Sequence, residues 1–234
     1  MLPDLDYEGQ QQISQGSVLV IGVGGLGSAV AYYLASSGVG KLTLVDFDKV
    51  ELSNLQRQIL HWTNDIGKEK VESAKSKLGE INPNVEIKTI ASALNAEELR
   101  IQIQHCDIVV EASDNFASRF LTNRLCVEEK TPLVCGSIIR FEGQITTFRP
   151  DLENKPCYQC LFPETDETAE TCTQSGVFAP AVGVIGSLQA VETLKILTGI
   201  GDDLSGRLLL FDALKSSWKQ TQFKKDPSCT LCNR

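Results

Sequence analysis

The chain has 234 residues and carries 22 basic against 30 acidic side chains, for a net charge of −8. This length fits one large domain, and 42% hydrophobic with 22% charged residues is typical of a soluble globular fold, which excludes a disordered or fibrous protein. The acidic balance argues against general binding to nucleic acid or to a membrane surface. We expect a cytoplasmic protein, because eight cysteines without a signal sequence at the start indicate a reducing compartment.

The first part of the chain alternates between short strands and helices. Ser17–Gly22 and Lys41–Asp46 are apolar runs typical of buried parallel strands, and Leu26–Ser37 between them predicts a helix. The uncharged stretch Gly16–Gly40 is long enough to span a membrane, but glycines interrupt its apolar character. We therefore interpret it as a buried strand, a tight turn and a buried helix.

The same alternation continues toward the middle of the chain. Apolar residues recur at helical spacing from Val71 to Ile81, and Asn95 and Glu98 are placed like a capping box. The predicted elements are, in order, helix Lys68–Ile81, strand Val85–Ile90, helix Asn95–Gln104, strand Asp107–Ala112, helix Asn115–Lys130 and strand Leu133–Gly136.

The pattern changes in the last hundred residues. Ile138–Phe148, Arg207–Phe211 and Trp218–Phe223 look like strands without helices between them, which predicts an antiparallel extension. Gly183–Leu197 is the last strong helix, and Asp151–Pro180 looks like a long polar loop. The whole pattern predicts an α/β fold with a doubly wound, Rossmann-like, mainly parallel sheet and antiparallel C-terminal strands.

A glycine-rich turn follows the first strand. Gly22, Gly24, Gly25 and Gly27 make up a turn that matches G-x-G-x-x-G, in which glycine allows the backbone to approach a phosphate at a helix N-terminus. Asp46 ends the next strand, where its carboxylate is placed to accept hydrogen bonds from ribose hydroxyls. The motif predicts an adenine nucleotide and leaves NAD and ATP both open, with tight packing and no ligand as the alternative.

Polar residues after the second strand favour ATP over NAD, because a triphosphate needs cations. Arg57 and Lys70 are placed to supply them, although a solvated surface lysine would also explain Lys70. Asp114 follows another strand, where a carboxylate suits either Mg²⁺ or a helix N-cap. The other candidate nucleotide-binding residues are Asp48, Ser53, Asn54, Leu55, Gln56 and Asn115.

The cysteines fall into three groups. Two C-x-x-C pairs supply four thiolates, which predicts a closed structural Zn²⁺ site. A redox motif is the alternative, disfavoured because neither pair is expected to begin a helix in a βα unit. The pairs are Cys157 with Cys160 and Cys229 with Cys232. Cys172 stands alone in the polar loop, and we expect core thiols at Cys106, Cys126 and Cys135. We assign no role to His61, which ends the helix expected over NLQRQIL, or to His105, expected at the surface.

Several strings of the sequence together resemble the ThiF/MoeB/HesA family, bacterial relatives of the ubiquitin-activating enzymes. They are GVGGLGS, VDFD, LSNLQRQIL, KVESA, SDN, CYQC and GSLQA. The resemblance implies ATP-dependent adenylation of the C-terminal glycine of a small ubiquitin-like sulfur carrier protein ending in Gly-Gly, in molybdopterin or thiamine biosynthesis. It places Gly25 and Asp46 on the nucleotide, Asn54, Arg57 and Lys70 on ribose and phosphates, and Asp114 on Mg²⁺.

The resemblance also implies an organisation and further partners. We expect a single domain over residues 1–234, with a nucleotide-binding half (1–136) and a carrier-binding and zinc-binding half (137–234). A homodimer and a sulfurtransferase are the expected partners. Cys172 matches a loop cysteine proposed to receive the activated carrier or its sulfur, and an incidental exposed thiol is the alternative.

One departure and two rival functions accompany this prediction. Relatives carry an arginine-bearing helix before the segment that matches Leu2–Gln12, and this arginine reaches the ATP of the partner subunit. The chain starts at Met1, so we expect either a truncated sequence or an enzyme without this contact. An NAD-dependent oxidoreductase would leave Arg57, Lys70 and the cysteine pairs unexplained. A non-catalytic carrier-binding subunit would leave Arg57, Lys70 and Asp114 unexplained.

Overall fold

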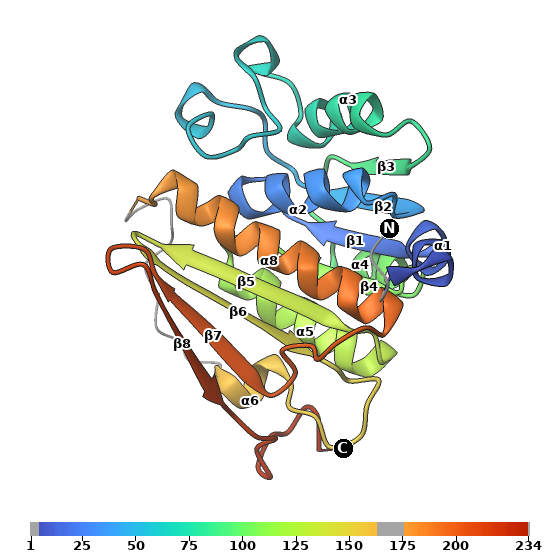
Figure 1. Ribbon diagram of the computed structural model, residues 1–234, viewed down its shortest axis with the longest axis vertical. Coiled ribbons are helices and arrows are strands. Elements are labelled where there is room, and N and C mark those ends of the chain that lie inside the picture. The colour runs from blue at the N-terminus through green and yellow to red at the C-terminus, as the bar shows by residue number, and fades with distance from the viewer. Residues whose placement is uncertain (1–4, 163–175, 234) are drawn as a thin grey trace.

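The computed structural model describes residues 5–162 and 176–233, and these form one mixed sheet with helices on both faces (Figure 1). Its strands run in the spatial order β3-β2-β1-β4-β5-β6-β7-β8, the first five parallel and the last three antiparallel to their neighbours. The strands are β1 (Ser17–Ile21), β2 (Lys41–Val45), β3 (Glu86–Ile90), β4 (Ile108–Glu111), β5 (Leu133–Ile139), β6 (Glu142–Phe148), β7 (Arg207–Asp212) and β8 (Ser217–Gln222).

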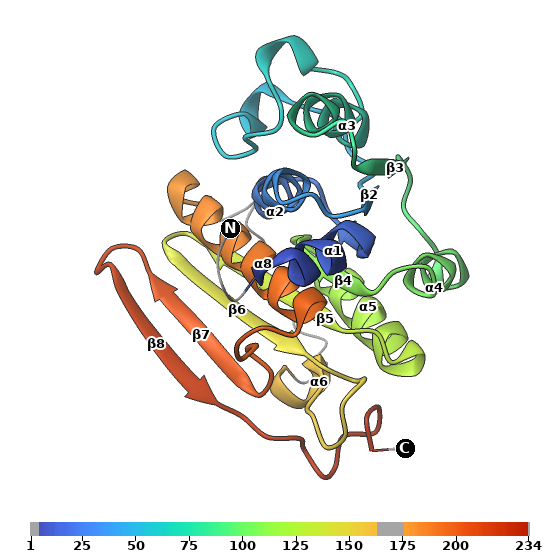
Figure 2. The ribbon, with the colours of Figure 1, turned by 45° about the vertical axis from the view of Figure 1, so that its right-hand side comes forward.

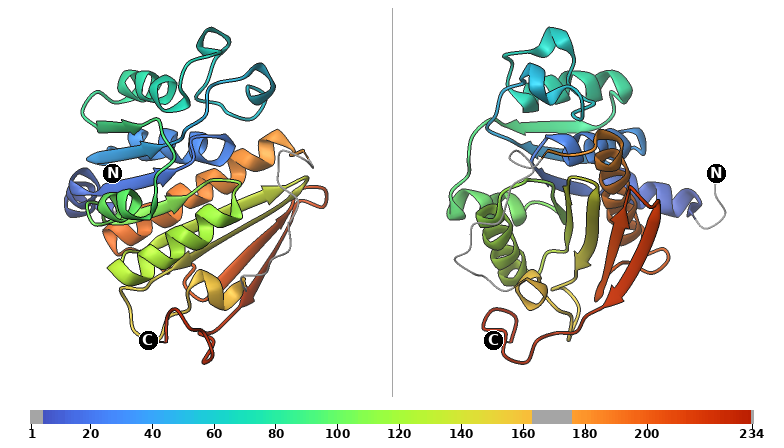
Figure 3. Two further views of the ribbon diagram at one scale, coloured as in Figure 1. Left: turned by 180° about the vertical axis from the view of Figure 1, so that it is seen from behind. Right: turned by 90° about the vertical axis from the view of Figure 1, so that its left-hand side faces the viewer.

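The helices lie in two layers, one on each face of the sheet (Figures 2 and 3). They are α1 (Tyr7–Gln15), α2 (Gly25–Ser36), α3 (Lys70–Ile81), α4 (Ala96–Ile103), α5 (Phe116–Glu129), α6 (Tyr158–Leu161) and α8 (Ala179–Thr198), with the 3-10 turns η2 (Leu52–Asn54) and η3 (Thr63–Asp65). Helices α2 and α8 cover one face, and α4 and α5 the other. Each layer buries its own apolar cluster against the sheet, as expected for a doubly wound fold.

The predicted order of strands and helices is confirmed, with four differences, one of which lies in the connection after β2 and is described with the candidate site. The strand expected over Ile138–Phe148 is wrong, because β5 continues to Ile139 and β6 returns from Glu142. Arg140 makes this turn with a positive φ of 51°, which the sequence pattern does not signal. The loop expected over Asp151–Pro180 contains α6 and ends at Ala179, where α8 begins with a proline in its first turn. The sequence also predicts no element over α1.

Among the described residues, one helix, α8, is long and apolar enough by composition alone to cross a membrane. Half of its most apolar window is buried inside the protein, against α2 and the sheet. Its buried face also carries Gln189 and Glu192, and Glu192 pairs with Lys195 at 2.6 Å and accepts from the Leu204 N–H at 2.7 Å. These buried polar contacts are those of a helix packed in the core.

A long connection, residues 46–69, joins β2 to α3 and is anchored by the carboxylate of Asp65. This side chain is buried and accepts hydrogen bonds from the Trp62 N–H at 3.0 Å and the Lys68 Nζ at 2.9 Å, while Lys77 lies 3.2 Å away. Burial alone would raise the pKa of Asp65, but the hydrogen bonds from Lys68, Trp62 and Lys77 hold it well below its usual range. The ionised carboxylate therefore ties the connection to α3.

We expect Asp65→Asn to lower the free energy of unfolding by about 2 kcal/mol at pH 7, because a buried charge-assisted hydrogen-bond network is broken. The lowered pKa means that this contribution is complete above the unfolded-state pKa of about 4 and is lost as the pH falls through the folded-state pKa. Urea unfolding at pH 7 and at successively lower pH below 4 measures the difference between the two proteins, which should shrink as the pH falls toward the folded-state pKa of Asp65. The exposed pair Lys49–Glu69 offers a control, Glu69→Gln, which should change stability by less than about 1 kcal/mol. Equal losses in the two variants would contradict the anchoring role of Asp65.

Candidate nucleotide site and cysteine cluster

The glycine-rich turn is shaped by two close backbone approaches at the carboxyl edge of the sheet. Gly22 has a φ of 86°, and a Cβ there would lie 3.0 Å from the backbone of Ala112 and Ser113. A Cβ on Gly27 would lie 1.9 Å from the Gly22 carbonyl oxygen, which no side chain tolerates. The turn from β1 into α2 therefore packs directly against the end of β4.

The N-terminus of α2 is open to an anion. Its N-cap is Gly24, and no side chain among the described residues caps the helix. The first backbone N–H groups of a helix have no intrahelical partner, and together with the helix dipole they attract negative charge. A Cβ on Gly24 would have only Gln58 nearby, at 3.5 Å, so a phosphate can approach this backbone closely.

Asp46 holds this turn in place. Its carboxylate accepts hydrogen bonds from the Val23 N–H at 2.7 Å and from the Asp48 N–H at 2.9 Å. Burial raises the pKa of the Asp46 carboxyl above its usual value, and Lys70 opposes that rise. The predicted ribose contact stays a prediction, since each carboxylate oxygen retains a further lone pair.

His61, to which the sequence assigned no role, contacts Val23, the residue whose N–H is bonded to Asp46. Its Nε2 lies 2.9 Å from the Val23 carbonyl oxygen and its Nδ1 3.0 Å from the Ser73 hydroxyl. A carbonyl only accepts, so Nε2 carries the proton and donates to Val23, while Nδ1 accepts from Ser73. Burial lowers the pKa of the His61 ring, which keeps the ring neutral at pH 7. A lone histidine gave no pattern from which this contact could be predicted.

Lys70 lies in the first turn of α3, as predicted, but it is not a solvated surface lysine. It is buried, and its Nζ lies 2.8 Å from the Asp48 carboxylate. Arg57 is half-buried, donates to the Ser53 carbonyl at 3.2 Å, and has its Cγ 3.7 Å from the position of a Cβ on Gly25. The two cations thus lie in the connection that passes the glycine-rich turn.

The segment NLQRQIL forms no α-helix, contrary to expectation. Residues 52–54 form the short 3-10 helix η2, and further turns follow. Asn54 and Ser53 contact each other at 3.3 Å, Leu55 is half-buried, and Gln56 is exposed. Gln58, which the sequence motifs did not single out, is buried beside Gly24, and its Oε1 has no hydrogen-bond partner among the described residues. A buried, unpaired polar atom at this place suits a bound nucleotide.

Of the two roles that the sequence left open here, the helix N-cap is filled by Asn115, and the Mg²⁺ role of Asp114 stays a prediction. Asn115 is the N-cap of α5, and its side chain accepts from the Ser118 N–H at 3.1 Å. Asp114 is exposed just beyond the carboxyl end of β4. Since β1, β2 and β4 run parallel, Asp114, the glycine-rich turn and Asp46 all lie at one edge of the sheet.

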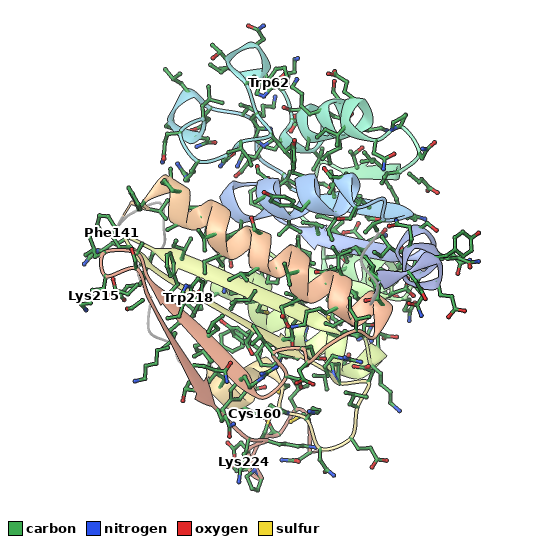
Figure 4. The ribbon with its side chains drawn as sticks, viewed as in Figure 1. Trp62, Phe141, Cys160, Lys215, Trp218 and Lys224 are labelled. Atoms are coloured by element: carbon green, nitrogen blue, oxygen red, sulfur yellow. The ribbon has the colours of Figure 1, made fainter. Side chains whose placement is uncertain are left out.

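The four paired cysteines meet although about 70 residues separate the two pairs. Their Sγ atoms all lie within 4.8 Å of one another, with Cys157–Cys160 at 3.9 Å, Cys157–Cys229 at 3.8 Å and Cys160–Cys232 at 3.4 Å. A tetrahedral Zn²⁺ with Zn–S distances of ~2.3 Å needs S–S edges of about 3.8 Å, so the donor set fits this ion. Burial raises the pKa of the Cys157 thiol to about 11, so a cation is needed to hold it as a thiolate. Cys160 lies at the opposite end of the long axis from Trp62 (Figure 4).

The other cysteine predictions have mixed outcomes. Cys157 is the N-cap of the short helix α6, which follows an antiparallel strand and so is not part of a βα unit. The meeting of both pairs favours one four-sulfur site over two redox pairs. Cys126 and Cys135 are buried and Cys106 is half-buried, which confirms them as packing residues. Cys172 lies outside the described residues. His105 is exposed, as expected.

A family profile, curated relatives and solved structures all match nearly the whole length of the chain. A profile of the ThiF family matches residues 1–231. The molybdopterin-synthase adenylyltransferase of Escherichia coli (strain K12) is 44% identical over 234 residues, which cover all of this chain and 94% of that protein. The sulfur carrier protein adenylyltransferase of Thermus thermophilus is 41% identical, covering 99% of this chain and 88% of that protein. The crystal structure of E. coli MccB with MccA-N7isoASN has a TM-score of 0.86 at 24% identity, over 96% of this chain and 69% of that chain, and shows the shared fold.

We expect the natively purified protein to hold one Zn²⁺ per chain, because four clustered thiols match its preferred ligands. Metal analysis of the wild type and of Cys160→Ser and Cys126→Ser measures this. The first variant should lose most of the metal, whereas the second removes a buried thiol outside the cluster and should keep it. A metal-free wild type, or equal metal in all three proteins, would reject the site.

Proposed function

Because the chain belongs to the ThiF family, we propose that it transfers AMP from ATP to the C-terminal carboxylate of a small sulfur carrier protein. The reaction would form a carrier acyl-adenylate and release pyrophosphate. The observation that carries this proposal is the open N-terminus of α2 with Arg57 and Lys70 in the connection beside it.

The charges at this edge favour ATP over NAD. The N–H groups of α2 would bind one phosphate, and Arg57 and Lys70 would neutralise the others, with Lys70 released from Asp48 as the nucleotide enters. A dehydrogenase would need neither cation. The buried, unpaired Oε1 of Gln58 offers the nucleotide a further hydrogen-bond acceptor.

Asp114 fits a role in holding Mg²⁺. Mg²⁺ is usually bound through one or two carboxylates together with substrate phosphates, and Asp114 presents an exposed carboxylate beside the turn where those phosphates would lie. When bound there, Mg²⁺ would neutralise charge on the phosphates as pyrophosphate leaves. The side chain of Asn115 is already used to cap α5.

The proposed reaction requires no general base. The C-terminal carboxyl group of a peptide ordinarily has a pKa of about 3.3–3.7, so it is already ionised at pH 7 and can attack the α-phosphorus directly. Both histidines are held by structural hydrogen bonds, His61 to Val23 and Ser73, and His105 to the Ile101 carbonyl at 2.7 Å. The side chains would act by aligning the two substrates and by stabilising charge.

The carrier and zinc functions are proposed for the second half of the chain. Residues 1–136 would bind the nucleotide, and residues 137–234 would bind the carrier and a structural Zn²⁺ that joins α6 to the segment after β8. We propose the molybdopterin branch over the thiamine branch, on the 44% identity to a molybdopterin-synthase adenylyltransferase. A sulfurtransferase would then supply sulfur to the acyl-adenylate.

We expect Arg57→Ala and Asp114→Asn to lower carrier-dependent exchange between ATP and pyrophosphate by at least about 100-fold, because each removes charge stabilisation at the phosphates. The assay uses a Gly-Gly-ending carrier from each branch, and the carrier of molybdopterin synthase should be the better substrate. Lys49→Ala, which replaces an exposed lysine of the same connection, serves as the control and should show near-normal exchange.

Stabilisation against heat by NAD but not by Mg·ATP would favour the oxidoreductase, and Mg·ATP binding without exchange would favour a non-catalytic subunit.

We also propose that the protein forms a homodimer. Helices α2 and α8 pack side by side and expose large apolar side chains, which a second copy would cover. These are Tyr32, Tyr33, Val184 and Val191. Sedimentation equilibrium should give twice the chain mass of 25.6 kDa, and Val191→Asp should shift the protein toward the monomer. The exposed Leu214 lies outside these helices, so Leu214→Asp is the matched control and should remain dimeric.

A further inference from the structure

Two buried charged side chains lie next to the segment that leads into Asp114, and the proposed reaction uses neither. Glu111 ends β4 with no exposed surface, and Arg119 of α5 is 5% exposed. The Glu111 carboxylate accepts from the Ser113 N–H at 2.8 Å and from the Thr122 hydroxyl at 3.2 Å. Burying two such charges costs much desolvation, and apolar side chains of similar volume could fill the same space.

Arg119 fixes the backbone that leads into Asp114. Its guanidinium donates to the Ser113 carbonyl at 2.6 Å and to the Gly136 carbonyl at 2.9 Å. The Ser113 carbonyl belongs to the same planar peptide unit as the Asp114 N–H. Holding that oxygen therefore sets the plane from which the Asp114 side chain projects.

The second carbonyl ties this contact to the rest of the sheet. Gly136 lies in β5 against α8, where a Cβ would come within 2.5 Å of the Gln189 side chain. Gln189 in turn donates to the Glu111 carbonyl at 2.9 Å. Arg119 is thus fixed against β4, β5 and α8 together, and a shift of its guanidinium would move the start of the loop that carries Asp114.

Tyr158 connects Arg119 to the cysteine cluster. It lies between Cys157 and Cys160 in the sequence, is 1% exposed, and lines one small cavity together with Arg119, so its hydroxyl and the guanidinium interact electrostatically. Its backbone N–H donates to the Asn123 side chain of α5 at 2.9 Å, and its ring packs against Phe162 with centroids 4.8 Å apart. The position of Tyr158 therefore depends on α6, and α6 is held by the cluster at one side and by α5 at the other.

We propose that Tyr158 and Arg119 are positioning residues that link the cysteine cluster to the Mg²⁺ site. The cluster fixes α6, Tyr158 holds the Arg119 guanidinium, and Arg119 orients the peptide unit before Asp114. This link rests on the proposed function in one respect, the binding of Mg²⁺ by Asp114. It gives the cluster an effect on nucleotide chemistry although its own closed sulfur shell has no place for a substrate.

The decisive variant is Tyr158→Phe, which removes only the hydroxyl and keeps the ring packing. We expect unchanged zinc content and unchanged affinity for ATP without added Mg²⁺, with a rise of about tenfold in the Mg²⁺ concentration that half-saturates ATP binding and pyrophosphate exchange. A residue with only a structural role would not move the Mg²⁺ requirement separately from the affinity for free ATP. Phe162→Leu is the matched control, because it loosens the same aromatic cluster and leaves the hydroxyl in place.

Two further arms separate the link from the site that it serves. Wild-type protein stripped of the cluster metal should show the same rise in Mg²⁺ requirement, and stripping Tyr158→Phe should add little, because the link is already cut. Arg119→Lys keeps the buried charge but loses the planar guanidinium whose Nη2 reaches both carbonyls, so it should behave like Tyr158→Phe. A normal Mg²⁺ requirement in Tyr158→Phe overturns the proposal. A normal requirement in Asp114→Asn instead overturns the assignment of Asp114 to Mg²⁺, and a Tyr158→Phe effect found beside it would have to act elsewhere.

Discussion

The peptide groups on both sides of Val23 are fixed by buried side chains, and the candidate nucleotide site depends on that. Asp46 accepts from its N–H, and His61 donates to its carbonyl, so both peptide groups of the turn at Val23 are oriented without a ligand. Asp46 comes from the end of β2 and His61 from the connection to α3. The turn is consequently held by segments on either side of it, and the N–H groups of α2 are oriented before any ligand binds. Such preorganisation is the main source of electrostatic stabilisation in enzymes.

Two cations buried in this acidic chain have different partners. Lys70 pairs with the Asp48 carboxylate and faces the site, where an incoming phosphate can replace the carboxylate as the partner of the ammonium group. Arg119 lies behind the site and donates to backbone carbonyls, so it supports geometry. Net charge therefore says little about this edge of the sheet, where the local arrangement of charges decides what can bind.

Much of the parallel sheet could be predicted, because buried strands and amphipathic helices leave periodic patterns and the glycine-rich turn leaves a motif. The turn at Arg140 could not, since a positive φ at a non-glycine residue has no sequence signal. His61, Gln58 and Arg119 were also missed as contributors, because each acts through contacts with distant segments. The cysteine pairs were the opposite case: their spacing predicted a common site, and the fold brings their sulfur atoms together. The role of Tyr158, which lies between Cys157 and Cys160, could not be predicted, because it contacts residues of α5 that are distant in the sequence.

The separation of the two cysteine pairs also bears on how the protein matures. Cys229 follows Cys157 by 72 residues, and the segment between them includes α8, β7 and β8. A ribosome makes the chain from its N-terminus, so a four-sulfur site can be completed only after both final strands have been made. A metal that bridges the pairs would close a loop of this length, and a cross-link of that span removes about 4 kcal/mol of chain entropy from the unfolded state.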